Sequence, residues 1–367
     1  MRAMIAFLAL AVWLYLIFAH GKFWQSVPQL PPATPPEFPD VDIIVPARDE
    51  AGTIGPAIGS LLAQDYCGNY RLLLVDDNST DGTAALAGAA ASLDIITLKS
   101  KPQEWSGKLW ALSQGVAASH APVILFTDAD IVHDPRHLSS LVAKLLQSRA
   151  DMVSEMVRLN CTSLAERALV PAFVFFFQML YPFARVNDPS SPVAAAAGGT
   201  VLIRREALQR SGGIDAIKNA LIDDVALAKS VKKSGSIYLG HSVLAASIRP
   251  YPHFADIWHM ISRTAFTQLR HSAILLVLTL LGLTLVWWVP AVAAFAGHGA
   301  AGVCGMMAWG ISAISYMPTL ARYGRNRLWA VALPLIATFY MAATFNSALN
   351  YWRGRGARWK SRAYGSG

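Results

Sequence analysis

The sequence "VILFTDAD" ends an apolar, strand-forming run with two carboxylates, Asp128 and Asp130. Carboxylates rarely close a buried strand without a partner, and a cation is the obvious candidate. Residues two apart in an extended segment point the same way, so we expect the two side chains to share one ligand. Their oxygen atoms suit Mg²⁺ or Mn²⁺, with a nucleotide diphosphate completing the coordination.

A second pair of neighbouring carboxylates, Asp223 and Asp224 in "IDDV", opens a segment with a helical pattern. Capping of the helix N-terminus is the usual role of such residues and suits one of the two. The other could serve as a general base beside a pocket. The positive end of the helix dipole would keep that carboxylate ionised.

The turn "VDDNSTDGT" carries Asp77, Ser79, Asp81 and Gly82 with the spacing that begins a calcium-binding loop. Gly88 stands where such a loop needs its bidentate glutamate, so calcium is excluded. Ser79 and Asp81 fit the capping of the helix that follows. Asp77, at a strand end, could instead accept a hydrogen bond from the N–H group of a nucleobase.

Two histidines, His133 and His137, have an H-x-x-x-H spacing just after the aspartate pair. Pro135 lies between them and disrupts the helical face that a zinc site would need. We therefore expect both histidines to be solvated loop residues.

The segments that must position these residues alternate between strand and helix patterns. Such alternation predicts an α/β fold with a parallel, helix-covered sheet. Ligands bind such sheets at the carboxyl ends of the strands, where the carboxylates fall. The predicted strands are 41–47, 70–77, 93–100 and 122–130, and the predicted helices are 52–64, 80–93 and 107–119.

The phenylalanine-rich segment 168–186 has no such regular context. Its pattern fits a helix lying on the surface of the protein or membrane and, equally, a core helix.

The composition, with 54% hydrophobic and 15% charged residues, is too apolar for an ordinary soluble enzyme. Four apolar stretches approach or exceed the roughly 20 residues that cross a bilayer: Ala3–Ala19, Ala273–Gly297, Gly302–Leu320 and Trp329–Tyr351. The first could be a cleaved signal peptide, but a retained anchor fits better beside the later spans. A stiff, extended, proline-rich spacer follows it at 21–40.

The net charge of +8 forms no stripe typical of nucleic-acid binding. Basic residues cluster at Arg322, Arg325 and Arg327 and in the tail 353–367, which suggests cytoplasmic flanks of membrane spans. The two clusters would lie on opposite sides if Trp329–Tyr351 crosses fully, so one apolar segment could be re-entrant or interfacial.

The three cysteines, Cys67, Cys161 and Cys304, are far apart and give neither a disulfide framework nor a metal-ligand spacing. A reducing, cytosolic environment for the polar part of the chain follows from this.

Taken together, the motifs between Asp42 and Arg270 resemble the family 2 glycosyltransferases, which have a GT-A fold. "IIVPARDE", "VDDNSTDGT", "GKLWALSQG", "TDAD", "AGGTVLIRREAL" and "IDDV" follow one another in that family's order. One N-terminal anchor and a C-terminal membrane block are similar to the layout of ceramide glucosyltransferases and closer still to that of bacterial hopene-associated glycosyltransferases.

This resemblance implies a role for individual residues. The nucleotide-sugar would contact Pro46, Ala47, Glu50, Asp77, Lys108 and Asp128, and Asp130 together with Asp128 would hold Mg²⁺ or Mn²⁺. The acceptor side would contain Gly198, Gly199, Thr200 and Arg263. Asp224 would be the base, with Asp223 capping the helix or orienting its neighbour.

Two departures from the family pattern matter. The family's Glu-Asp pair is Asp-Asp here, and its Q-x-x-R-W motif is reduced to Arg263, with Met260 and Thr264 beside it. Since that motif accompanies processive synthesis, its erosion favours single-sugar transfer and leaves the role of Arg263 open.

The sequence thus predicts a transmembrane anchor (1–20), the spacer (21–40), a GT-A domain (41–270), C-terminal membrane helices (271–352) and a basic tail (353–367). We expect a multi-pass protein of the inner (plasma) membrane with a cytoplasmic catalytic domain. It would be an inverting, metal-dependent enzyme that moves one sugar, from a UDP-sugar, to a membrane lipid related to hopanoids. The alternatives are a polyprenyl-phosphate or polysaccharide glycosyltransferase and a non-catalytic nucleotide-sugar-binding scaffold; the sequence identifies no protein partner.

Overall fold

The computed structural model describes residues 2–88, 93–355, 358–359 and 362–363, and the chain divides into two compact units. The sheet unit comprises Pro28–Asn160 and Arg185–Pro250 with the described tail residues, and the helical unit comprises Met1–Val27, Cys161–Ala184 and Tyr251–Gly356. The predicted GT-A domain at 41–270 is therefore interrupted, because the segments Cys161–Ala184 and 251–270 pack with the apolar helices.

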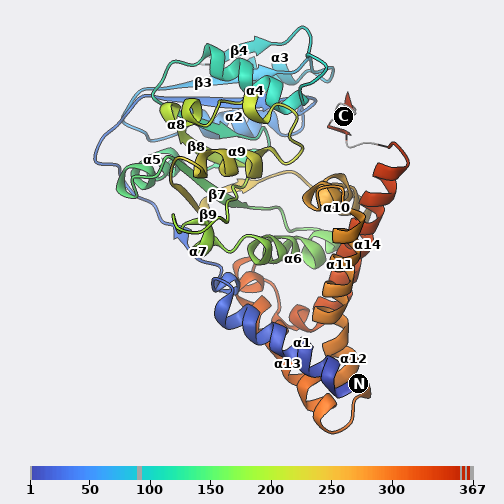
Figure 1. Cartoon of the computed structure of the whole chain (residues 1–367). Coiled ribbons are helices and arrows are strands. Elements are labelled where there is room, and N and C mark those ends of the chain that lie inside the picture. Colours follow the sequence, from blue (N-terminus) through green and yellow to red (C-terminus); the bar gives the residue numbers. More distant parts are fainter. Residues whose placement is uncertain (1, 89–92, 356–357, 360–361, 364–367) are drawn as a thin grey trace. The chain divides into compact units, whose positions relative to one another are not determined.

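The sheet unit is built on a nine-stranded sheet in the order β1-β9-β7-β8-β5-β2-β3-β4, with β6 paired to β9 (Figure 1). The strands are β1 Gln29–Leu30, β2 Val41–Ala47, β3 Tyr70–Asp76, β4 Asp94–Thr97, β5 Val123–Thr127, β6 Ile131–His133, β7 Met152–Arg158, β8 Thr200–Arg204 and β9 Ile237–Ser247. The helices are α2 Ile54–Leu62, α3 Thr83–Gly88, α4 Gly107–Ala118, α5 His137–Gln147, α8 Arg205–Arg210 and α9 Asp223–Lys232.

Strands β2 to β5 are mutually parallel, as the strand–helix alternation predicts. The sheet as a whole is mixed, because β8 runs antiparallel to both β5 and β7. The spacer is not wholly extended and unpacked either: its residues Gln29 and Leu30 pair with β9, and Leu30 is buried.

The two faces of the sheet are covered by different helices. Ile43 and Leu74 share one core with Ile58 of α2 and Leu141 of α5. Alternate residues of the same strands point the other way, toward α4. That helix approaches so closely that a Cβ atom at Gly115 would lie 2.4 Å from Cγ2 of Ile44.

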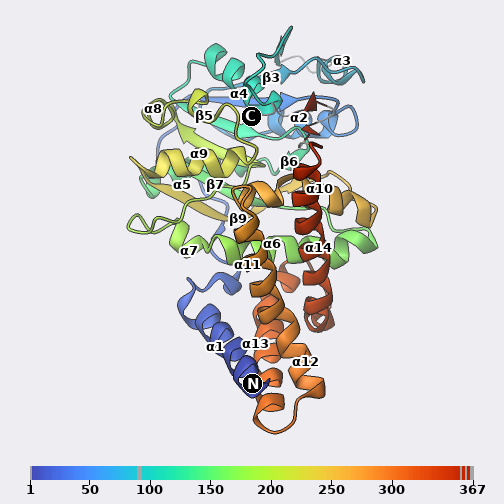
Figure 2. The ribbon, with the colours of Figure 1, turned by 45° about the vertical axis from the view of Figure 1, so that its right-hand side comes forward.

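Among its described residues, the helical unit contains four helices that are long and apolar enough to cross a membrane. They are α1 Arg2–Ala19, the continuous segment Ala273–Ala296 (α11 Ala273–Leu283, a π-helical turn and α12 Val289–Ala296), α13 Ala300–Arg322, and Arg327–Trp352, which ends in α14 Leu333–Trp352. Both views show α1, α12 and α13 side by side, and α10 (Phe254–Gln268) beside α14 (Figure 2).

The phenylalanine-rich helix α6, Leu164–Leu180, is a core helix of this unit. Phe175 is fully buried, with its ring centroid 5.0 Å from that of Tyr316 and 5.5 Å from that of Phe23. Aromatic side chains from the 3-10 turn Phe23–Gln25 and from α13 thus pack against the buried face of α6, as the core-helix interpretation expects, whereas Leu164 and Leu180 at its ends are exposed.

Candidate active site

A pocket of the sheet unit lies where β5 ends and where α4 and α9 begin. Its polar wall consists of Lys108, Asp128, Gly198, Asp223 and Asp224. The other lining residues, apart from Thr127, are apolar: Pro46, Leu109, Leu112, Phe126, Val201, Ile214, Ile217 and Leu227. The sequence-predicted donor residues Pro46, Lys108 and Asp128 and the base candidate Asp224 therefore line one pocket, whereas Ala47, Glu50, Asp77 and the metal candidate Asp130 do not line it.

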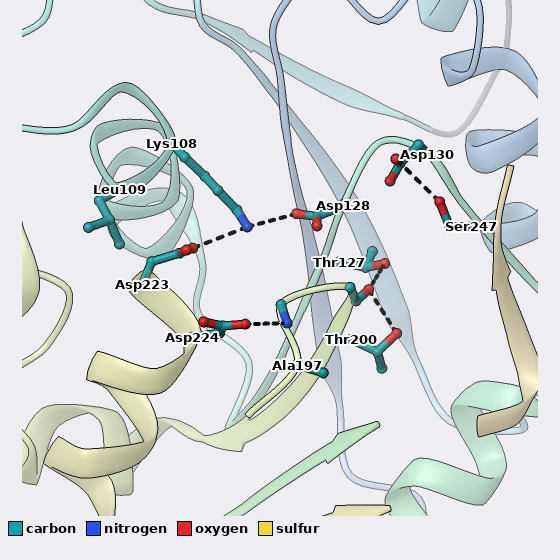
Figure 3. A network of polar contacts seen from close by, with 12 residues as sticks. Lys108, Leu109, Thr127, Asp128, Asp130, Ala197, Thr200, Asp223, Asp224 and Ser247 are labelled. Carbon is teal, nitrogen blue, oxygen red and sulfur yellow. Dashed lines mark hydrogen bonds and ion pairs between the residues drawn. The ribbon is translucent and has the colours of Figure 1, made fainter. Parts of the chain in front are cut away.

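Lys108 is the centre of the polar wall (Figure 3). Its Nζ lies 2.9 Å from Oδ1 of Asp128 and 3.1 Å from Oδ2 of Asp223. Burial alone would lower the pKa of Lys108, but these two carboxylates outweigh it and hold the pKa well above its usual value. They also offset the unfavourable placement of a cation in the first turn of α4.

Asp224 faces the loop before β8, and its Oδ2 accepts a hydrogen bond of 2.8 Å from the backbone N–H of Gly198 (Figure 3). Burial and the neighbouring charge of Asp223 raise the pKa of Asp224 to about 7, against the opposing effect of Lys108. The expectation that the helix dipole keeps this carboxylate ionised is wrong, because desolvation dominates.

The expected capping role of Asp223 is also wrong. Ile222 precedes the first residue of α9 without a side-chain capping bond, and Asp223 is bound to Lys108 instead. Asp224 accepts the backbone N–H of Val225 at 2.7 Å, so it is the base candidate that meets the helix N-terminus.

Asp128 and Asp130 pair with different cations of the chain itself, Lys108 and Arg249. Residues 129–130 form a turn between the two. Asp130 accepts from Nε of Arg249 at 2.6 Å, and Nη2 of Arg249 lies 2.7 Å from Oε1 of Glu50. Burial raises the pKa of Asp128, Lys108 opposes the shift, and the charge of Asp130 adds to it.

The donor set can be tested against a divalent cation. Within the described ranges, no three His, Cys, Asp or Glu side chains converge as a complete protein-only metal site. Mg²⁺ is commonly held by one or two carboxylates together with substrate phosphates. Asp130 and Asp128 are buried or partly buried carboxylates at one strand end, so they fit a cation whose coordination a diphosphate completes.

The predicted nucleotide-binding turn is tied to the end of β2. The N–H of Asp77 donates to the carbonyl of Ala47 at 2.8 Å, and the N–H of Thr80 donates to Asp49 at 2.9 Å. Arg48 lies 3.6 Å from the carboxylate of Asp77, which is itself buried.

In the same turn, Asp81 accepts from the N–H of Thr83 at the start of α3, as its predicted capping role requires. Asp81 also accepts a hydrogen bond from the backbone N–H of Ala51. These bonds order the turn.

The predicted acceptor-side residues separate into two groups. Gly199 and Thr200 lie in the loop at the start of β8, where Oγ1 of Thr127 donates to the Gly199 carbonyl at 2.9 Å. A Cβ atom at Gly198 would lie 3.3 Å from Asp224, so a glycine leaves the base accessible. Arg263 belongs to α10 of the helical unit, where its side chain is exposed.

His133 and His137 are not solvated, contrary to the expectation from the sequence. Both are buried, and His133 Nδ1 lies 2.7 Å from His137 Nδ1. His137 Nε2 lies 2.6 Å from Oε2 of Glu155, and His133 Nε2 lies 3.1 Å from Oγ1 of Thr127. The helix α5 begins only at His137, so Pro135 precedes it and does not disturb it.

The direction of this hydrogen-bond chain follows from its last member. Thr127 gives its single proton to Gly199, so it must accept from His133, whose Nδ1 then accepts from His137. Burial and the nearby His137 lower the pKa of His133 well below its usual value, in agreement with a neutral ring. One proton is left to be shared between His137 and Glu155.

Sequence reasoning missed Arg249, His133 and Glu155 as parts of this region. A basic residue immediately after the strand-like run "SVLAASI" was the available signal for Arg249. No sequence signal indicated the buried histidine chain, because its members are polar residues, which are usually exposed, and Pro135 lies between the two histidines.

Comparison with known proteins defines the class to which this site belongs. Residues 42–212 match the family model described as Glycosyl transferase family 2. A mannosyltransferase from Pyrobaculum calidifontis, solved with GDP-Man and Mn²⁺, superimposes with a TM-score of 0.59 at 19% identity, over 97% of this chain and 100% of that one. The sheet unit therefore has a GT-A fold, and residues 42–212 are similar to the glycosyltransferase family 2 domain.

Curated relatives share shorter segments. A dodecaprenyl-phosphate galacturonate synthase of Rhizobium johnstonii is 26% identical over 117 residues, 31% of this chain and 35% of that protein. The succinoglycan biosynthesis protein ExoU of Rhizobium meliloti is 33% identical over 109 residues, 29% and 30% of the two chains. A 4,4'-diaponeurosporenoate glycosyltransferase of Staphylococcus aureus is 33% identical over 89 residues, 24% and 23%. The chain spans about a third or less of the length of these relatives.

Proposed function

We propose that this protein is a membrane-bound, inverting glycosyltransferase that moves a single sugar from a nucleotide-sugar to a hydroxyl group of a membrane lipid. The observation that carries the proposal is the meeting of Lys108, Asp128 and Asp224 in one pocket of the sheet unit, much of which is similar to the glycosyltransferase family 2 domain. This transfer needs a cation near the phosphates, carboxylate oxygens that can hold a metal ion, and a base; Asp224, with a pKa of about 7, is suited to be the base.

The donor, which we propose is a UDP-sugar, would lie between the end of β2 and the pocket. Pro46, Ala47, Glu50 and Asp77 would border the nucleotide, and Lys108 would meet its phosphates. Mg²⁺ or Mn²⁺, held by Asp130 and Asp128, would stabilise the negative charge of the leaving diphosphate.

In the transfer, Oδ of Asp224 takes the proton of the acceptor hydroxyl. The acceptor oxygen forms a bond to the anomeric carbon while the bond from that carbon to the diphosphate oxygen breaks. A single displacement inverts the anomeric carbon. Lys108 favours the charged form of Asp224, and backbone N–H groups hold both of its oxygens, that of Val225 on Oδ1 and that of Gly198 on Oδ2.

A lipid acceptor is supported by the four apolar helices and by two relatives, the dodecaprenyl-phosphate galacturonate synthase and the 4,4'-diaponeurosporenoate glycosyltransferase. The finer proposal, a hopanoid-related hydroxyl, rests on the resemblance in layout alone. The protein would lie in the inner membrane with its sheet unit in the cytoplasm.

A polyprenyl-phosphate acceptor is the second candidate, favoured by the name of one relative. A phosphate is already ionised at neutral pH and needs no general base. Loss of Asp224 would therefore be tolerated with a phosphate acceptor and not with a hydroxyl acceptor.

The experiment is mass spectrometry of lipids made by the purified full-length protein from a total lipid extract and labelled UDP-sugars, with GDP-sugars in parallel. We expect a product heavier by one sugar on a lipid hydroxyl, absent when a chelator is in excess. A glycosyl phosphate product would establish the second candidate, and transfer undiminished by chelation would remove the cation from the mechanism.

A further inference from the structure

One arginine joins two buried carboxylates that come from different strands. Glu50 follows β2, Asp130 follows β5 and Arg249 follows β9. Arg249 lies 2.6 Å from Asp130 through Nε and 2.7 Å from Glu50 through Nη2. A single guanidinium thus fills the position between the proposed metal ligand and a residue at the proposed nucleotide site.

The arginine is held firmly in this position by its backbone. The N–H of Ile248 donates to the carbonyl of Asp130 at 2.9 Å, and the N–H of Arg249 donates to Oγ of Ser247 at 3.3 Å. That hydroxyl lies 3.4 Å from Oδ2 of Asp130 (Figure 3). The carboxylate and the guanidinium are therefore positioned by backbone segments that follow β5 and β9 and are hydrogen-bonded to each other.

Charge explains what the arginine does. Asp130 is 6% exposed and Glu50 is 8% exposed, and two buried carboxylates that face each other repel unless a cation lies between them. Arg249 supplies that cation. A divalent ion on Asp130 would lie beside the guanidinium bound to Oδ2 of the same carboxylate, so the two cations repel each other and compete.

Phosphate offers the arginine an alternative partner. The planar guanidinium binds phosphate through two parallel hydrogen bonds, and such charge-assisted pairs are strong. A diphosphate arriving beside Asp130 can therefore draw Arg249 away from the carboxylate and leave it to the divalent ion.

We propose that Arg249 makes the binding of the divalent cation and of the nucleotide diphosphate interdependent. Without a donor the guanidinium occupies the cation position between Glu50 and Asp130, and with a donor it moves to the diphosphate. This inference rests on the proposed function, since it uses the metal and donor assigned there. By reciprocity, each ligand then increases the affinity for the other by the same factor.

The test measures Mn²⁺ binding by electron paramagnetic resonance of the free ion, on the full chain in detergent, with and without UDP, and with GDP in parallel. For the wild type we expect weak Mn²⁺ binding alone and at least tenfold tighter binding with the nucleotide. Arg249→Gln should bind Mn²⁺ alone at least tenfold more tightly than the wild type and should gain little from the nucleotide.

Two further variants keep the test decisive. Arg249→Lys retains the charge but not the two-pronged geometry, so its Mn²⁺ affinity alone should match the wild type while its nucleotide affinity falls. Arg71→Gln is the matched control. Arg71 Nε lies 3.2 Å from Oδ1 of the buried Asp42, away from the pocket, so this substitution should change neither affinity.

Equal Mn²⁺ affinity of Arg249→Gln and wild type in the absence of nucleotide would overturn the inference. Failure of the proposed metal site gives a different result: Asp130→Asn would then bind Mn²⁺ as the wild type does, with or without nucleotide.

Discussion

Asp224 combines two opposing influences at the scale of one side chain. Burial and Asp223 oppose its ionisation, whereas Lys108 and the N–H groups of Val225 and Gly198 favour it. The resulting pKa of about 7 is suitable for a base that must accept a proton at neutral pH and later release it.

The first prediction concerns the pH dependence of turnover. Asp224 accepts a proton only when ionised, so the rate should fall as the pH decreases through about 7 at saturating donor. Asp223→Asn removes a neighbouring negative charge, lowers the pKa of Asp224 and should move this fall to lower pH. A rate that stays constant from well below to well above pH 7 would rule out Asp224 as the titrating base.

The second prediction concerns stability. Because the pKa of Asp224 is raised in the folded protein, the folded state pays increasingly for ionisation as the pH rises from about 4 to about 7. Asp224→Asn avoids this cost, so its melting temperature relative to the wild type should increase over that pH range. A difference in melting temperature that does not change with pH would contradict the assigned environment.

Some residues of the candidate site could be predicted from the sequence and others could not. Asp128, Asp130 and Asp224 could be predicted because carboxylates at strand and helix ends need an explanation. Arg249 could not, because it lies 119 positions from Asp130 and only the strand order brings them together. The pKa of Asp224 also depends on burial, which no local pattern reports.

At the scale of secondary-structure elements, α4 places Lys108 through its close approach to the sheet. Gly115 permits that approach, because a Cβ atom there would lie 2.4 Å from Cγ2 of Ile44 and 3.1 Å from Cγ2 of Val75. Both of these atoms branch directly from strand residues and have little freedom to move.

The third prediction compares two glycines in helices. Gly115→Ala should lower the melting temperature and weaken donor binding, since overpacking costs about 1–3 kcal/mol and displaces α4. Gly59→Ala in α2 is the matched control: nothing lies within 4 Å of its Cβ position, so it should be neutral or stabilising. Equal effects of the two substitutions would show that α4 is not closely packed.

The fourth prediction concerns the buried chain from Glu155 to Gly199. Glu155→Ala leaves His137 without its partner in a fully buried site, which should cost about 1–3 kcal/mol of folding free energy. Glu155→Gln can still donate to the ring and should cost less, as thermal unfolding in detergent will measure. Indistinguishable losses for the two variants would contradict the proton arrangement.

The positions of helices and strands were predictable where the local periodicity of apolar residues determines them. β2, β3, β5, α4 and α9 appear where the alternation of apolar residues places them. The antiparallel direction of β8 could not be predicted, because it depends on how the chain returns to the sheet. The buried pairing of β1 within a proline-rich stretch is another result of tertiary contacts.

At the scale of the whole molecule, the four apolar spans were predictable from length and composition, whereas the grouping of the chain into two interleaved units was not. Cys161–Ala184 joins the helical unit although its neighbours on both sides belong to the sheet unit. A helix with apolar residues on all sides does not reveal what it packs against.

The fifth prediction uses a native thiol to determine the topology. Cys67 is exposed on the sheet unit, so in a Cys161→Ser, Cys304→Ser background it is the reporter of that unit's location. A membrane-impermeant maleimide should label it in inside-out vesicles and not in intact spheroplasts. Labelling only in intact spheroplasts would place the catalytic domain outside the cytoplasm.

The measurement that tests the central claim most directly is sugar transfer to lipid by Asp224→Asn, with donor affinity determined on the same preparation. Asparagine preserves the shape of the side chain and removes its basicity. The account predicts unchanged donor affinity and a turnover reduced by roughly two to four orders of magnitude, the usual range for loss of a general base, with a smaller loss for Asp223→Asn. Normal transfer by both variants, or an inert Asp223→Asn beside an active Asp224→Asn, would contradict it.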